Sequence, residues 1–178
     1  IVGRPVGSGR IPGRLPLVLE RHQALFESVT VPPLPVPLLL VHTGGKPMAY
    51  LSSSRQQSQQ SLPGLVTFLP RHVRSEVTLR GVGEGTVVYF DGERSLPAWL
   101  LRGGDREPMT FTNDVVVAIT RRLMAELESR APTESYLKSL ATALLAELQR
   151  ELARTRAVSA LPASRGGLRI AHTAIQYM

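Results

Sequence analysis

The side chains that could carry out chemistry are few in this sequence and widely spaced. The chain has no cysteine, and its histidines are His22, His42, His72 and His172. The lack of cysteine excludes disulfides, thiolate metal sites and cysteine nucleophiles. No two histidines follow the His-x-His or His-x-x-x-His spacing of a metal pair. Lys46 follows a glycine as in a phosphate-binding loop, but Pro47 replaces the Ser or Thr that would bind the metal. We therefore expect a protein that is not an enzyme and that has no catalytic residue, metal or cofactor.

One spacing is more informative. Gly64 is followed six residues later by Pro70, within the segment 62–70. This pattern resembles the second conserved motif of the cupin β-barrels, in which a metal-binding His follows. The corresponding position here is Ser75, and a Ser hydroxyl is a poor ligand for Fe, Mn or Zn beside imidazole or carboxylate. The resemblance implies a barrel scaffold without metal chemistry.

The first half of the chain has the pattern of a β-rich domain. Short β-branched or aromatic segments alternate with turn residues, and the predicted strands are 25–31, 36–42, 47–51, 65–69, 73–80 and 86–90. The polar stretch 52–61 fits an exposed hairpin end, and Gly81, Gly83 and Gly85 fit a tight turn. Strands at this spacing favour a compact sandwich or barrel.

In the second half the hydrophobic period becomes helical. Asn113 and Asp114 are good caps for a helix whose apolar residues share one face, and Thr133 can cap a second helix. The predicted fold class is therefore α+β, with a cupin-like antiparallel β-barrel of the jelly-roll type followed by two antiparallel α-helices.

The apolar positions of the second helix cover roughly 140°, which is wider than one neighbouring element requires. Two alternatives follow: the helix is wedged between the barrel and its sister helix, or it has a self-association face. On the second alternative the dimer-interface candidates are Leu137, Leu140, Leu144 and Leu148.

Three polar residues of the predicted strands are candidates for a ligand pocket. His42 follows Leu38 and Leu40 on one strand face, and Tyr50 lies on the next strand. Ser75 occupies the position that corresponds to the metal-binding His of the cupin motif. Packing in the core or on the surface is the alternative for each. A barrel lined mainly by Leu and Val favours an apolar or aromatic ligand over a sugar.

The net charge of +7 does not define a nucleic-acid site. Only two of the 21 basic residues are lysines, and the arginines are scattered, with no run longer than Arg121 and Arg122. The aromatic residues that could stack on bases are also few. No stretch approaches the roughly 20 apolar residues that span a bilayer, so we expect no membrane partner.

The order of these parts divides the chain into three regions. Residues 1–22 are rich in Gly, Pro and Arg and are predicted to form an N-terminal arm, and residues 23–161 the barrel with its helical pair. Residues 162–178 are predicted to be a linker and the start of a further helix, with a second domain beyond Met178.

In this order the parts resemble the AraC family of bacterial transcription regulators. The residues that carry the resemblance are Pro63-Gly64 with Pro70, Asn113-Asp114, and Leu168-Arg169-Ile170 with Ile175 and Tyr177. The resemblance implies a cytoplasmic sensor and dimerisation domain. It also implies a homodimer that binds a small-molecule effector in its metal-free barrel, and DNA only through an absent C-terminal helix-turn-helix domain. The alternative is a small cupin-fold enzyme, an isomerase or dioxygenase, with non-standard metal ligands.

Overall fold

A computed structural model describes residues 4–13, 16–26, 29–45, 48–52, 57–73, 75–91, 97–101 and 108–160. The strands are β1 (Gly7–Ile11), β2 (Leu17–Phe26), β3 (Val29–Val31), β4 (Leu38–Gly45), β5 (Met48–Ser52), β6 (Gln57–Ser61), β7 (Leu65–Leu69), β8 (Ser75–Phe90) and β9 (Met109–Thr112). The helices are α1 (Ala98–Leu101), α2 (Asp114–Leu127) and α3 (Glu134–Ala160). The predicted linker 162–178 lies outside the described residues.

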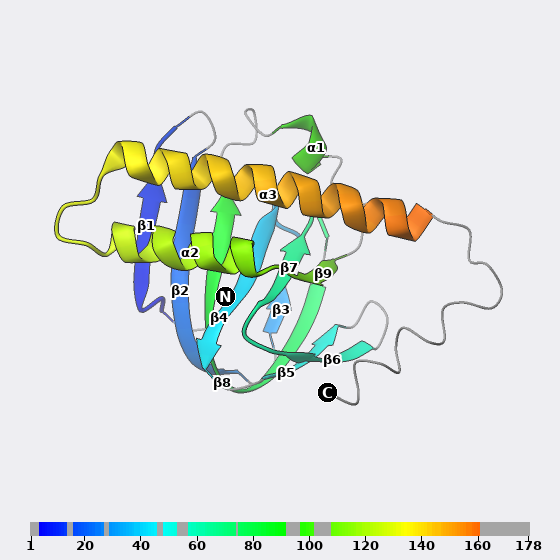
Figure 1. Cartoon of the computed structure of the whole chain (residues 1–178). Coiled ribbons are helices and arrows are strands. Elements are labelled where there is room, and N and C mark those ends of the chain that lie inside the picture. The colour runs from blue at the N-terminus through cyan, green and yellow to red at the C-terminus, as the bar shows by residue number, and fades with distance from the viewer. Residues whose placement is uncertain are drawn as a thin grey trace.

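The strands form one antiparallel sheet that is organised around the long strand β8. The main path of the sheet runs β1-β2-β8-β4-β7-β9. The second half of β8 lies between β2 and β4, whereas its first half pairs with β3 and β5. One strand thus carries the chain from the main part of the sheet into a second part, so the sheet curls (Figure 1). The predicted antiparallel sheet followed by two helices is confirmed, as is the hairpin that β5 and β6 form.

The three glycines predicted to form a tight turn lie inside β8 instead. Gly83 and Gly85 pair with β2 on one side and with β4 on the other, and Gly81 pairs with Phe26. A strand that changes its partners must bend, and a glycine tolerates such a bend because it has no side chain to pack. The glycines therefore mark the curl of the sheet, not its end.

The N-terminal arm predicted for residues 1–22 is also corrected. Residues 7–11 and 17–26 form the hairpin of β1 and β2, which is the edge of the main sheet. The side chains of Ile11, Leu17 and Leu19 are at most 1% exposed. Their burial stabilises the hairpin, because each contributes about 1.5–3 kcal/mol relative to an exposed side chain.

The two long helices begin where the sequence predicts. Asn113 is the N-cap of α2, and its side-chain oxygen accepts a hydrogen bond from the backbone N–H of Val116 at 3.0 Å. α3 begins at Glu134, directly after Thr133. The helices lie side by side and antiparallel across one face of the sheet (Figure 1).

The main core lies between that face and the helices. The sheet contributes residues such as Leu39, Val66 and Phe68, and α2 contributes Leu123 and Met124. Burial on α3 follows the helical period, as it does on α2.

Three of the four dimer-interface candidates belong to this core. Leu137, Leu144 and Leu148 are buried within a single chain, and Leu140 is partly buried against the same cluster. The structure thus favours the packing alternative for these leucines, because a side chain already covered by its own chain has no surface to offer a partner. Dimerisation itself stays a prediction.

Candidate functional site

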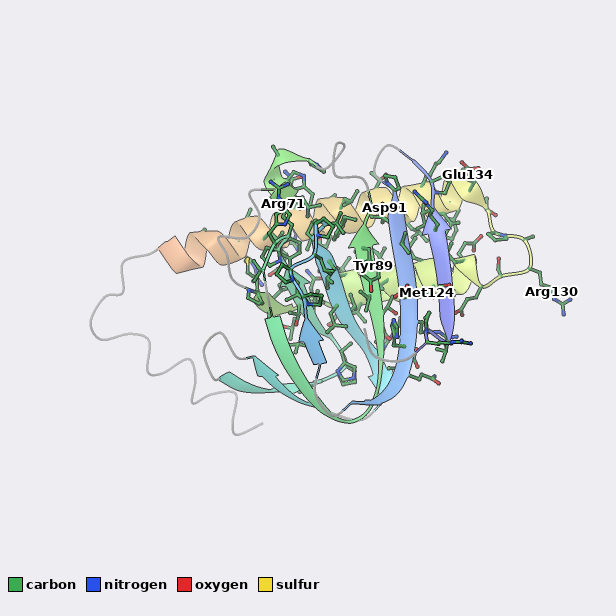
Figure 2. The ribbon with its side chains drawn as sticks, turned by 180° about the vertical axis from the view of Figure 1, so that it is seen from behind. Arg71, Tyr89, Asp91, Met124, Arg130 and Glu134 are labelled. Carbon is green, nitrogen blue, oxygen red and sulfur yellow. The ribbon has the colours of Figure 1, made fainter. Side chains whose placement is uncertain are left out.

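The two faces of the main sheet have different partners. Residues of alternate parity point to opposite faces, and the core residues Leu19, Leu39 and Val88 point to the helices. We call the other side the barrel face. Its residues on the three central strands are Val18, Glu20 and His22 of β2, Leu38, Leu40 and His42 of β4, and Gly85, Val87 and Tyr89 of β8. Figure 2, seen from behind, shows Tyr89 on β8 with both helices beyond the sheet.

The barrel face is partly covered although α2 and α3 lie on the other side. Leu38, Leu69 and Val87 form a small apolar cluster there, joined by the partly buried Leu40 and Tyr89. This burial fits a sheet that curls over its own face, as in a barrel. The face therefore combines an apolar cluster with the polar groups of His22, His42, Glu20 and Tyr89.

Two histidines stand on either side of Gly85 on this face. The register pairs His22 of β2 with Gly85 and also pairs His42 of β4 with Gly85. Two strand spacings, roughly 10 Å, therefore separate their Cα atoms. Both side chains are buried, with 5% and 3% of their surface exposed. Because the residue between them is a glycine, no side chain of β8 stands between the two imidazoles.

His22 belongs to a hydrogen-bonded group with Glu20 and Tyr89. Its Nε2 lies 3.3 Å from Oε2 of Glu20, and the Tyr89 hydroxyl donates to the same oxygen at 3.2 Å. Burial, and then the charge of Glu20, raises the pKa of Tyr89 well above its ordinary value. The phenol therefore stays protonated and keeps its role as a donor to the carboxylate.

The second nitrogen of His22 has no such partner. Nδ1 is buried, and no hydrogen-bonding group of the described residues lies within reach of it. Buried polar atoms in folded proteins nearly always have a partner, which can be a protein group, a water molecule or a ligand. Among the described residues, the Nδ1 atom of His22 is thus a buried polar atom whose partner is missing.

The structure places His42 where strand alternation predicts, on one face with Leu38 and Leu40. Its Nε2–H donates to the backbone carbonyl of Gly44 at 2.8 Å, across a bulge in the pairing of β4 with β8. The side chains of Tyr50 and Ser75 lie outside the described residues, so a role for them in ligand binding stays a prediction.

His22, Glu20 and Tyr89 are not among the site residues that the sequence predicts. His22 fell in the region predicted to be an arm, where Gly and Pro obscured the strand pattern. The signal that could have found it is the alternation of Leu17 and Leu19, which assigns Glu20 and His22 to the opposite face.

The structural findings on metal binding and on membrane-spanning helices concern the described part of the chain only. Within it, no three His, Asp or Glu side chains are grouped so that they could hold a metal ion. None of the helices described there has an apolar stretch long enough to cross a bilayer.

Comparison with known proteins gives a match in structure but not in sequence. No family model and no curated protein sequence matches the chain. Among solved structures it is similar to the regulator ToxT of Vibrio cholerae, which belongs to the AraC family.

The apo K231A form of ToxT matches with a TM-score of 0.56 and 8% identity over 76% of this chain and 56% of that chain. Wild-type ToxT with a bound unsaturated fatty acid matches with a TM-score of 0.55 and 8% identity over 85% and 58%. ToxT bound to (E)-4-(8-methylnaphthalen-1-yl)but-3-enoic acid matches with a TM-score of 0.53 and 10% identity, over 76% of this chain and 57% of that chain.

These matches confirm the predicted fold. The chain has an α+β, cupin-like fold that is similar to the matched part of ToxT, and the identity of 8–10% establishes the fold alone. It spans just over half of the ToxT chains that it matches.

Proposed function

We propose that this chain is the effector-binding domain of a bacterial AraC-type transcription regulator and that it binds a small apolar molecule on its barrel face. The observation that carries the proposal is the pair of buried histidines on either side of Gly85, on a sheet face that combines Leu and Val with Glu20 and Tyr89. A few convergent polar groups in an apolar concave surface are typical of small-molecule sites.

The ligands in the ToxT structures support this proposal. Two of the matching ToxT chains hold an unsaturated fatty acid and a naphthalenyl butenoic acid, and both molecules combine a large apolar body with one polar group. The barrel face of this chain likewise offers apolar side chains beside polar groups. The matched chains are also those of a regulator and not of an enzyme, which favours binding over catalysis.

In this proposal the domain acts by conformational coupling. An effector that binds one arrangement of barrel and helices better than another shifts the population toward that arrangement. The change would reach DNA through a separate DNA-binding domain, in the cytoplasm. Twofold operators are bound by dimers, and a change in the spacing of two such domains alters their fit to the half-sites.

Dimerisation through α3 is part of the proposal, but it needs a face other than the buried leucines. The outward side of α3 carries exposed small residues, among them Ala143, Ala146 and Ala153, and Leu140 lies at its border. This side is where a second copy of the chain would pack.

The test blocks the space between the two histidines. A Cβ built on Gly85 lies 3.5 Å from the carbonyl oxygen of Val41 and 3.7 Å from Cδ1 of Leu40, which are ordinary contacts. We therefore expect Gly85→Ala to fold normally. Its methyl group would crowd a bound molecule, at a typical cost of about 1–3 kcal/mol, or about fivefold to a hundredfold in affinity.

The measurement is a thermal shift against a library of small apolar and aromatic molecules. A true effector at a hundred times its Kd stabilises the chain by about 2.7 kcal/mol, which raises Tm by roughly 5–10 °C. Gly13→Ala is the matched control, since nothing lies within 4 Å of its Cβ. The control should keep the full shift, and Gly85→Ala should lose at least about a third of it. Equal shifts in both variants, or no shift with any compound, would contradict the proposal.

A further inference from the structure

We infer that the effector is an electrically neutral molecule with an apolar body and a hydroxyl or N–H group, which donates a hydrogen bond to Nδ1 of His22. This inference rests on the proposed function and names the chemical class of its ligand. It starts from the buried Nδ1 that has no partner among the described residues.

The partners of His22 decide what Nδ1 can accept. The Glu20 carboxylate can only accept hydrogen bonds when it is ionised, so the proton of the neutral imidazole lies on Nε2, 3.3 Å from Oε2. The other nitrogen, Nδ1, then carries a lone pair and is an acceptor. A ligand that satisfies it must bring a donor.

The charges around this position disfavour an anionic ligand. Glu20 provides a carboxylate one hydrogen bond away from the His22 ring, and the Tyr89 hydroxyl is already directed at that same carboxylate. An acid placed at Nδ1 would bring a second negative charge into a buried region. Burying a charge without a partner is costly, so a neutral donor is the better match.

The neighbouring residues define the rest of the ligand. Leu40 and Val87 are cross-strand partners on the barrel face, two residues along their strands from His42 and Gly85. An apolar body that covers them can therefore lie on the sheet while its polar group reaches His22. One donor on an apolar scaffold, such as an aromatic alcohol, has this form.

Three probes of nearly equal size separate the alternatives: benzyl alcohol, toluene and benzoate. Each is titrated into the chain, with its histidines labelled with ¹⁵N, at about pH 8, where free imidazole is neutral. We expect benzyl alcohol to bind more tightly than toluene or benzoate. We also expect only the alcohol to shift the ¹⁵N resonance of Nδ1 of His22 as a new hydrogen bond would.

The variant His22→Phe keeps an aromatic ring but removes the acceptor. It should weaken the binding of benzyl alcohol roughly tenfold and leave the affinity for toluene nearly unchanged. His72→Asn is the control, because His72 is exposed at a turn with φ of 60°, a conformation that Asn tolerates. The control variant should bind all three probes like the wild type, and thermal unfolding of each variant checks that it is folded.

The results distinguish a failure of the neutral-ligand inference from a failure of the proposed effector-binding function. Tighter binding of benzoate than of the alcohol would show an anion site and overturn the inference, while the effector function would stand. An unmoved Nδ1 resonance, or an unchanged affinity of His22→Phe for benzyl alcohol, would indicate that Nδ1 binds a structural water. Either result would overturn the inference and leave the effector function standing. Failure of all three probes to bind would count against both proposals.

Discussion

At the scale of single residues, the side chain of Asn113 joins the start of α2 to α3. Its oxygen caps α2, while its amide group donates to Glu147 at 2.9 Å and to the buried Glu151 at 3.2 Å, both on α3. Arg150 also binds Glu147, and this contact, with the Asn113 hydrogen bond, lowers the pKa of Glu147. The stabilisation from Glu147 is thus complete above the ordinary pKa of Glu, and it is lost as the pH falls through the lowered value.

We predict that Asn113→Ala destabilises the chain by about 1–3 kcal/mol, because it removes a helix cap and a donor to a buried carboxylate. Asn113→Asp separates these two effects: it keeps the capping oxygen but puts a carboxylate against Glu147 and Glu151. At neutral pH it should be at least as destabilising as Ala. Urea unfolding measures both variants.

Ser139→Ala is the control for these variants, since Ser139 is exposed on α3 and its hydroxyl donates to the Ser135 carbonyl of its own helix. It should change stability by no more than about 0.5 kcal/mol. An Asn113→Asp variant as stable as the wild type would show that the bridge to α3 contributes nothing.

At the scale of elements, local signals predicted the helices and some of the strands but not the N-terminal hairpin. Caps and a 3.6-residue period are set by neighbours along the chain, so α2 and α3 begin where the sequence predicts. Gly7 and Gly9 had the pattern of an irregular arm, yet they are where β1 approaches α2. A Cβ on Gly9 would lie 2.9 Å from the Leu127 side chain. A close approach between distant elements has no local signature, and the same holds for His22, whose role depends on the register of β2, β8 and β4.

The burial of α3 gives a prediction at this scale. Leu144→Asp places a carboxylate in the core, where Leu144 is fully buried, and should unfold the chain or destabilise it by more than about 4 kcal/mol. Ala146→Asp changes an exposed residue of the same helix. It should stay folded, and it should weaken any dimer formed by the outward side of α3.

Circular dichroism and analytical ultracentrifugation distinguish these outcomes. A folded, monomeric Leu144→Asp chain would show that the leucines of α3 form the dimer interface. If the wild type is a dimer and Ala146→Asp leaves it intact, the outward side of α3 is not the interface.

At the scale of the whole molecule, backbone hydrogen bonds join the barrel to the helices. The N–H of Gly64 donates to the carbonyl of His42, and the N–H of Asn113 donates to the carbonyl of Gly64. From Asn113 the contacts continue to α3, and Arg121 of α2 donates to the carbonyl of Thr43 on β4 at 2.8 Å. A residue of the barrel face is thus two hydrogen bonds from the start of α2. Gly64 fits this position because its φ of 106° is in the region that favours glycine.

The central claim is that a small molecule binds on the barrel face between His22 and His42. The most direct test is a crystal structure of the chain grown with the compound that gives the largest thermal shift. We expect electron density for that compound over Gly85, with a donor atom within about 3.2 Å of Nδ1 of His22. Density for the compound on the outer surface of the helices, with only water beside His22, would contradict it.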